Sequence, residues 1–149
     1  MGTTAWAYSD LDWKLGGKWG DLAQYIGRYE YDQVLNDKRV SAQLDTMLGK
    51  EEIEKLKARL DVRGSIGFDE DCLILSGNAP HQGGQEAAFV NVCIYKGEVH
   101  VAILSGGIIK VYSPEAPHYE YLPRAMKTWI YTVKDLKSFL QPSFVEMKN

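Results

Sequence analysis

Residues that support catalysis or metal binding are scarce in this sequence. It has two cysteines and three histidines in 149 residues, and no local spacing supplies the three or four converging ligands of a zinc site. The sequence shows no nucleophile elbow and no phosphate loop, and no apolar run approaches the roughly 18 to 20 residues that span a bilayer. We therefore expect no metal, no cofactor, no membrane span and no enzyme of these classes.

Positive charge and a leader sequence are also lacking. The net charge is -3 and the isoelectric point is near 5.6, which argues against nucleic-acid binding and favours a basic protein partner. Residues 1–6 have neither the basic start nor the apolar centre of a secretory signal. As written, the chain is expected to be soluble and cytoplasmic, or periplasmic if a leader has been removed.

The two cysteines bear on the compartment. Cys72 and Cys93 both lie in apolar, strand-like runs and lack the spacing of a metal or redox motif. A thiol in such a run usually packs as a small hydrophobe, so we expect two buried, reduced thiols in a reducing compartment. A cross-strand disulfide in an oxidising compartment is the alternative, and it requires Cα atoms within about 7 Å.

The hydrophobic pattern predicts helices first and a sheet afterwards. Apolar residues at helical spacing predict helices near 21–27, 37–48 and 50–60, the last with a solvated charged face that includes Arg59. Short apolar runs joined by glycine-containing turns predict antiparallel strands at 62–68, 72–76, 87–95, 99–104, 108–112 and 126–132. A helix near 132–140 is expected to follow. The prediction is an α+β fold in which about five strands are covered on one face by the helices around 37–60.

A single domain is expected over residues 1–149. Its N-terminal arm, residues 1–19, is rich in aromatic residues, namely Trp6, Tyr8, Trp13 and Trp19, which we expect to pack in the core or cover a domain edge. Residues 114–149 form a proline-containing C-terminal extension. His100 alternates with valines and is expected on the less buried face of the sheet, and His118 is expected at the surface.

The third histidine lies in the most distinctive segment of the chain. Residues 76–84 read Ser-Gly-Asn-Ala-Pro-His-Gln-Gly-Gly between two predicted strands. Glycines give this loop backbone freedom, whereas Pro80 fixes its own φ and biases Ala79 towards extended geometry. The pattern predicts a shaped loop that presents His81, although the imidazole could simply bond to carbonyl groups of its own turn.

Residues 75–86, followed by Phe89-Val-Asn-Val92, resemble the inhibitor-of-vertebrate-lysozyme family. In that family the loop has the form Cys-Lys-Pro-His-Asp-Cys, lies between two strands and plugs the lysozyme active site with its histidine. Pro80 and His81 match this signature. Asn78 and Gly83 stand at the cysteine positions, Ala79 replaces the lysine and Gln82 the aspartate. The helix-then-sheet order extends the resemblance over about residues 20–113.

The resemblance implies a bacterial inhibitor-like module that binds a protein, with a lysozyme-like muramidase as the partner. His81 would be the main contact, with Asn78, Pro80 and Gln82 shaping the loop; a cytoplasmic member could act as an immunity protein. Two alternatives remain open: a small enzyme with His81 as general base, assisted by Glu86 or a nearby Asp, or a structural protein that binds through its aromatic N-terminus. The sequence is also compatible with a homodimer.

Overall fold

The computed structural model describes residues 17–80, 86–114, 119–136 and 142–145. Four helical segments come first: η1 (Gly17–Tyr25), α2 (Tyr31–Leu35), α3 (Lys38–Met47) and α4 (Gly49–Arg59). The strands are β1 (Val62–Arg63), β2 (Gly67–Asp69), β3 (Cys72–Asn78), β4 (Glu86–Cys93), β5 (Glu98–Ser105), β6 (Ile108–Tyr112) and β7 (Pro142–Val145). Between β6 and β7 lie the short η2 (Tyr119–Tyr121) and the longer α5 (Arg124–Leu136).

The described strands form one sheet in the order β1-β3-β4-β5-β6-β7, with β2 beside β1 on the free side of β3. All neighbours pair antiparallel except β7, which runs parallel to β6. Consecutive strands from β3 to β6 are sheet neighbours because short turns join them. The predicted α+β fold, with N-terminal helices, an antiparallel sheet and a C-terminal helix, is confirmed.

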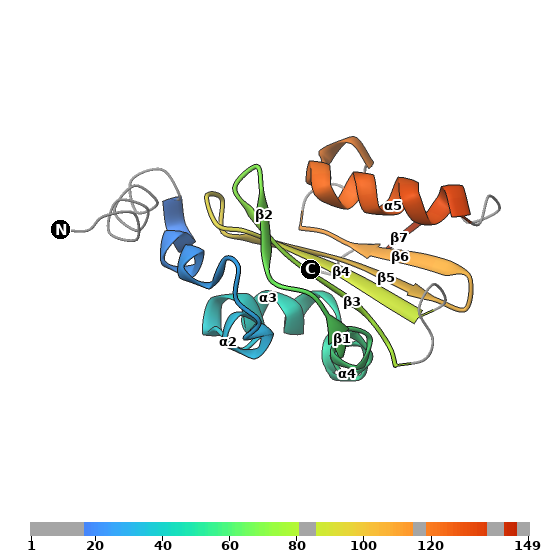
Figure 1. The fold of residues 1–149 in the computed structure, drawn as a ribbon, viewed down its shortest axis with the longest axis horizontal. Coiled ribbons are helices and arrows are strands. Elements are labelled where there is room, and N and C mark those ends of the chain that lie inside the picture. The colour runs from blue at the N-terminus through green and yellow to red at the C-terminus, as the bar shows by residue number, and fades with distance from the viewer. Residues whose placement is uncertain (1–16, 81–85, 115–118, 137–141, 146–149) are drawn as a thin grey trace.

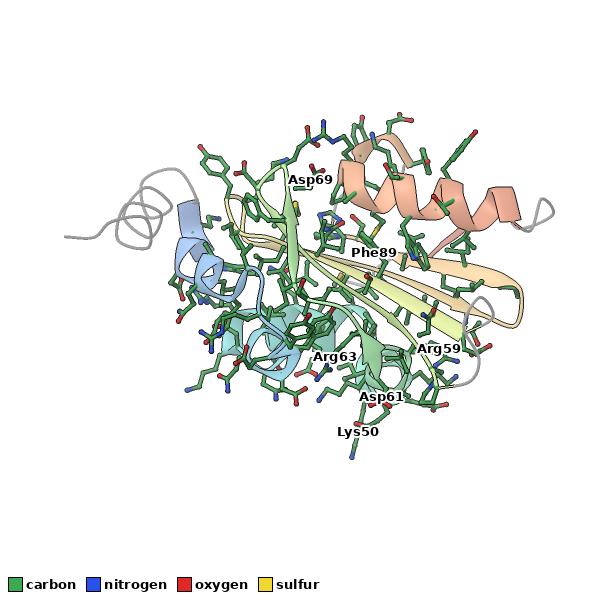
Figure 2. All side chains as sticks on the ribbon, viewed as in Figure 1. Lys50, Arg59, Asp61, Arg63, Asp69 and Phe89 are labelled. Atoms are coloured by element: carbon green, nitrogen blue, oxygen red, sulfur yellow. A yellow bond between two sulfur atoms is a disulfide. The ribbon has the colours of Figure 1, made fainter. Side chains whose placement is uncertain are left out.

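Helices cover both faces of the sheet (Figure 1). Side chains alternate between the faces of a strand, so Val90 and Val92 pack against the layer of α2, α3 and α4, whereas Phe89 packs against α5. The ring centroids of Phe89 and Trp129 of α5 are 5.6 Å apart, and Figure 2 shows Phe89 on the α5 side. The central strands are therefore buried on both faces: every residue of β4 after Glu86 is buried, including Asn91, which donates to the Leu73 carbonyl at 3.1 Å.

The predicted strand at 126–132 is wrong, because these residues belong to α5. Its β-branched and aromatic residues favour a strand by propensity, but Met126 and Ile130 are buried four residues apart, with Trp129 and Val133 packed beside them. This is helical spacing, and burial of such a stripe outweighs propensity. The parallel strand β7 was not predicted, because residues 142–145 lie beyond the expected helix.

The predicted strand at 62–68 is present but divided into β1 and β2. At the gap between them, the backbone of Ser76 in β3 bonds to Tyr31 of α2, a short helix that was not predicted. The Tyr31 hydroxyl donates to the Ser76 carbonyl at 3.1 Å and accepts from the Ser76 amide at 3.2 Å. Both backbone groups are thereby satisfied without a neighbouring strand.

Other local predictions also hold. Asp37 caps α3 by accepting from the backbone amides of Arg39 and Val40. Trp19 is buried in the core next to the N-terminal helices, which confirms core packing for this tryptophan. Trp6, Tyr8 and Trp13 lie outside the described residues, as does His118.

Candidate functional site

The predicted binding loop connects two neighbouring strands in the middle of the sheet. Asn78 ends β3 and pairs with Ala87 of β4, and the Ala79 amide donates to the Glu86 carbonyl at 2.9 Å. Asn78 is partly buried and Pro80 is exposed in a turn, so both lie at the closed end of this hairpin. His81 and Gln82 lie outside the described residues. The structure thus defines the base of the loop.

One carboxylate holds that base against two other parts of the fold. Glu86 forms an ion pair with Arg59 at the end of α4, and it accepts hydrogen bonds of 3.0 Å from the Ser105 hydroxyl and the Gly106 amide. Arg59 also donates to Ser105 at 3.0 Å. We call Arg59, Glu86, Ser105 and Gly106 the loop-base clamp. It links α4, the start of β4 and the β5–β6 turn.

The two charged side chains of the clamp are largely removed from solvent. The side chains of Arg59 and Glu86 are 12% and 19% exposed, so the expected solvated position of Arg59 is wrong. The helical pattern placed Arg59 with the charged face, but the sheet end passes close to the last turn of α4 (Figure 2). Burial by itself would raise the pKa of Glu86, but hydrogen bonds from Gly106, Ser105 and Arg59 outweigh it and lower that pKa.

This environment bears on the enzyme alternative. A general acid or base must reach the proton that it transfers and needs a pKa near the working pH. The Glu86 carboxylate instead has three donors from the clamp and a lowered pKa. Glu86 therefore stabilises the loop base, and it is poorly suited to assist His81 in catalysis.

A glycine brings the loop end of β3 close to the chain that leaves α4. A Cβ atom on Gly77 would lie 2.6 Å from the Val62 carbonyl oxygen and 3.1 Å from the Leu60 Cα. Any side chain at this position would force β3 away from β1. The sequence signal for this contact is a glycine inside a strand pattern, which often marks a close backbone approach.

The expected pair of free thiols is wrong, because Cys72 and Cys93 form a disulfide. The two cysteines are register partners in β3 and β4 with Cα atoms 3.8 Å apart. Their burial was predicted correctly. Their pairing depends on the β3–β4 register, which brings together two residues 21 positions apart. The disulfide closes the hairpin at the end opposite to the loop, whereas the resemblance placed the family's cysteines beside the loop.

His100 is buried rather than on an open face. It is 3% exposed, because α5 and the segment before it cover the second face of the sheet. Its Nδ1 lies 2.8 Å from the Ser113 hydroxyl, and its Nε2 lies 3.5 Å from a Glu98 carboxylate oxygen. Ser113 is itself buried, so this Ser-His-Glu arrangement offers no accessible nucleophile.

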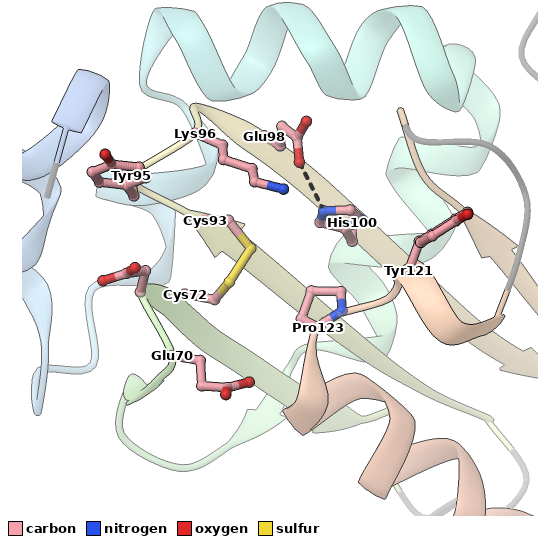
Figure 3. Close-up of a pocket in the computed structure, with 10 residues that line it drawn as sticks. Glu70, Cys72, Cys93, Tyr95, Lys96, Glu98, His100, Tyr121 and Pro123 are labelled. Carbon is pink, nitrogen blue, oxygen red and sulfur yellow. Dashed lines mark ion pairs between the residues drawn. A yellow bond between two sulfur atoms is a disulfide. The ribbon is translucent and has the colours of Figure 1, made fainter.

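Beside His100 lies a cavity of about 180 Å³, and the disulfide forms part of its wall (Figure 3). Figure 3 shows Lys96, Glu98 and His100 from one side of this cavity and Tyr121 and Pro123 from another. Among the described residues no cluster of three or more His, Cys, Asp or Glu side chains could hold a metal ion. No described helix is long and apolar enough to cross a membrane.

A family model described as inhibitor of vertebrate lysozyme matches residues 39–134. The chain belongs to this family. The match covers α3, α4, the strands β1 to β6 and most of α5, so it includes the β3–β4 hairpin and the loop-base clamp. No curated protein and no solved structure matches the chain significantly. Membership of the inhibitor-of-vertebrate-lysozyme family implies a protein-binding role directed at lysozyme, and not an enzyme.

Proposed function

We propose that the loop at residues 79–85 inserts into the active-site cleft of a lysozyme-type muramidase and that His81 makes the main contact. The observation that carries this proposal is the family match across the hairpin that bears the loop. The loop-base clamp supports it, because a rigid base lowers the entropy lost when a loop binds. Asn78, Pro80 and Gln82 would shape the loop around the histidine.

The chemistry of the target explains why an imidazole suits this position. Glycosidases of this type present two carboxyl groups across their cleft, one protonated and one ionised. An imidazole has two ring nitrogens, so it can donate to the ionised carboxylate and also pair with the acid. Hydrogen bonds to a charged carboxylate are about twice as strong as neutral ones. The inserted loop would also exclude water and substrate from the cleft.

The loop differs from the family loop in two respects that bear on its target, namely the lost charges and the lost covalent closure. Ala79 and Gln82 remove the positive and negative charges that the resemblance places beside the proline and histidine. Asn78 and Gly83 remove the covalent closure of the loop. The loop-base clamp supplies a non-covalent alternative to that closure, and the changed charges favour a target that differs from animal-type lysozyme. A cytoplasmic location stays a prediction, and its argument from free thiols no longer holds.

The test compares wild type with His81→Ala against a panel of muramidases that includes animal-type lysozymes. We expect the variant to bind its target more weakly by roughly 2 kcal/mol or more, as interface hot spots do, with a nearly unchanged melting temperature. Tyr131→Ala, on the exposed face of α5, is the control and should match wild type in both measurements. Calorimetric titration and thermal melting provide the readouts.

Two results would contradict this function. A lower melting temperature with unchanged inhibition would make His81 a turn residue that stabilises its own loop. If the wild-type protein inhibits no muramidase in the panel, the chain shares the family's fold but not this activity.

A further inference from the structure

Two exposed aliphatic side chains flank the loop at the same end of the sheet. Val62 of β1 and Ile108 of β6 are each 52% exposed. Every other strongly exposed large hydrophobic residue in the described part of the chain is aromatic. Single exposed aliphatic residues are common on protein surfaces, so the position of these two beside the loop is the feature that bears on function.

Strand pairing places both residues in one row with the base of the loop. Val62 pairs with Asn78 of β3, and Ile108 pairs with Ser105 of β5, which in turn pairs with Glu86. The loop therefore connects β3 and β4, and these two strands lie between β1 on one side and β5 and β6 on the other. Four strand spacings separate β1 from β6, which amounts to about 19 Å.

The two side chains also face opposite sides of the sheet. Ile108 lines a hollow with Lys55 and Arg59 and so lies on the α4 side. Val62 shares the face of its register partner Asn78, and alternation along β3 puts that face on the α5 side, with Ile74. A loop inserted into a cleft has one wall on each side. Val62 and Ile108 are placed to meet the two walls.

Interface size supports a contact outside the loop. A stable protein complex buries about 800 Å² on each partner and involves about 20 to 30 residues a side. The loop at 79–85 has seven residues, so it cannot form such an interface alone. The surface from which it emerges must supply the remainder, and in the described residues Val62 and Ile108 are the apolar side chains there.

Both flanks are fixed relative to the base of the loop. The Val62 carbonyl lies against the backbone of Gly77, where no Cβ atom would fit. On the other side, Glu86 accepts from Ser105 and from Gly106 in the turn that leads to Ile108. The base of the loop and its two flanks are therefore held together before binding, and such preorganisation favours tight binding to a rigid cleft.

We propose that Val62 and Ile108 form two apolar contacts on either side of the loop and pack against the opposite rims of the muramidase cleft. This inference rests on the proposed function and extends it from one loop to a surface about 19 Å across, the four strand spacings from β1 to β6. The partner is the same lysozyme-type enzyme, with apolar or aromatic side chains at its cleft rims.

The test measures inhibition constants of Val62→Glu and Ile108→Glu against the most sensitive muramidase. Each variant should inhibit about tenfold more weakly or worse, because it places a charge in a desolvated contact. The double variant should inhibit more weakly by the product of the two single-variant factors, since sites this far apart act independently. Phe68→Glu, at the other end of the β1–β2 edge, and Tyr131→Glu on α5 are matched controls and should inhibit like wild type.

The outcomes separate this inference from the proposed function. If Val62→Glu and Ile108→Glu inhibit like wild type while His81→Ala does not, the flanks make no contact, although the loop does. A wild-type protein that inhibits no muramidase overturns both. If a glutamate variant does not fold, the alanine variants decide, because each should still weaken inhibition about threefold through lost apolar area. Wild-type inhibition by both alanine variants would also overturn the proposal.

Discussion

The disulfide between Cys72 and Cys93 should contribute a large part of the stability of this domain. Cross-linking residues 21 positions apart removes loop-closure entropy from the unfolded chain, which corresponds to about 3 kcal/mol of unfolding free energy. For a domain of this length, a change of that size lowers the melting temperature by about 6 to 12 °C. Reduction of the bridge in the otherwise unchanged protein should produce this loss.

Inhibition should respond much less to the same change. Asn78 lies six positions after Cys72 along β3, which places the bridge about 20 Å from the loop at the usual rise per residue. The loop-base clamp is independent of the cysteines. We therefore expect the reduced protein, while folded, to keep its inhibition constant within about threefold, less than 1 kcal/mol of binding free energy.

The measurement is urea unfolding of the oxidised and reduced wild type, with Cys72→Ala/Cys93→Ala as the control. The double variant should unfold like the reduced protein and should not respond to the reductant. Alkylation and intact-mass measurement of the native protein should find no free thiol. Two thiols that label in the native state, or a reduced protein as stable as the oxidised one, would refute the reasoning.

Four further variants test the loop and its base. Glu86→Ala should cost about 2 kcal/mol of stability, because it leaves the partly buried Arg59 without its carboxylate, and urea unfolding measures this cost. The folded structure lowers the pKa of Glu86, so its stabilising contribution is present above the ordinary pKa of 4.5 and is lost as the pH falls through the depressed pKa. Glu86→Gln should therefore flatten the dependence of the melting temperature on pH between pH 5 and 3. A pH dependence equal to that of wild type would contradict this. Gly77→Ala should lower stability by about 1 to 3 kcal/mol through overpacking, and an unchanged melting temperature would show that β3 can shift. Asn78→Cys with Gly83→Cys should restore covalent closure of the loop and tighten inhibition, because less entropy is lost on binding; weaker inhibition would show that the loop base differs from the family geometry.

Several elements could be predicted because their signals are local. Asp37 caps α3 through its own neighbours, and glycine-containing turns at 96–97 and 105–107 specify hairpins within a few residues. The loop at 79–85 was found in the same way, since glycines and a proline between two apolar runs are visible without any tertiary information.

Other features depend on partners that lie far away in the sequence. Residues 126–132 have strand propensity, and only the second face of the sheet, which needs a helix to cover it, decides that they are helical. The same covering layer buries His100, which by alternation alone looked exposed. Arg59 follows the charged pattern of its helix, and it is partly buried because Glu86 of β4 and Ser105 of β5 approach it.

Local signals specify the α+β class, the succession of helices and hairpins and the place of the loop between β3 and β4, because hydrophobic period and turn residues act over short distances. Long-range packing sets the pairing of Cys72 with Cys93, the clamp on Glu86 and the placement of Val62 and Ile108 beside the base of the loop. Each of these depends on strand register and on helix packing, and both result from contacts between residues that are far apart in the chain.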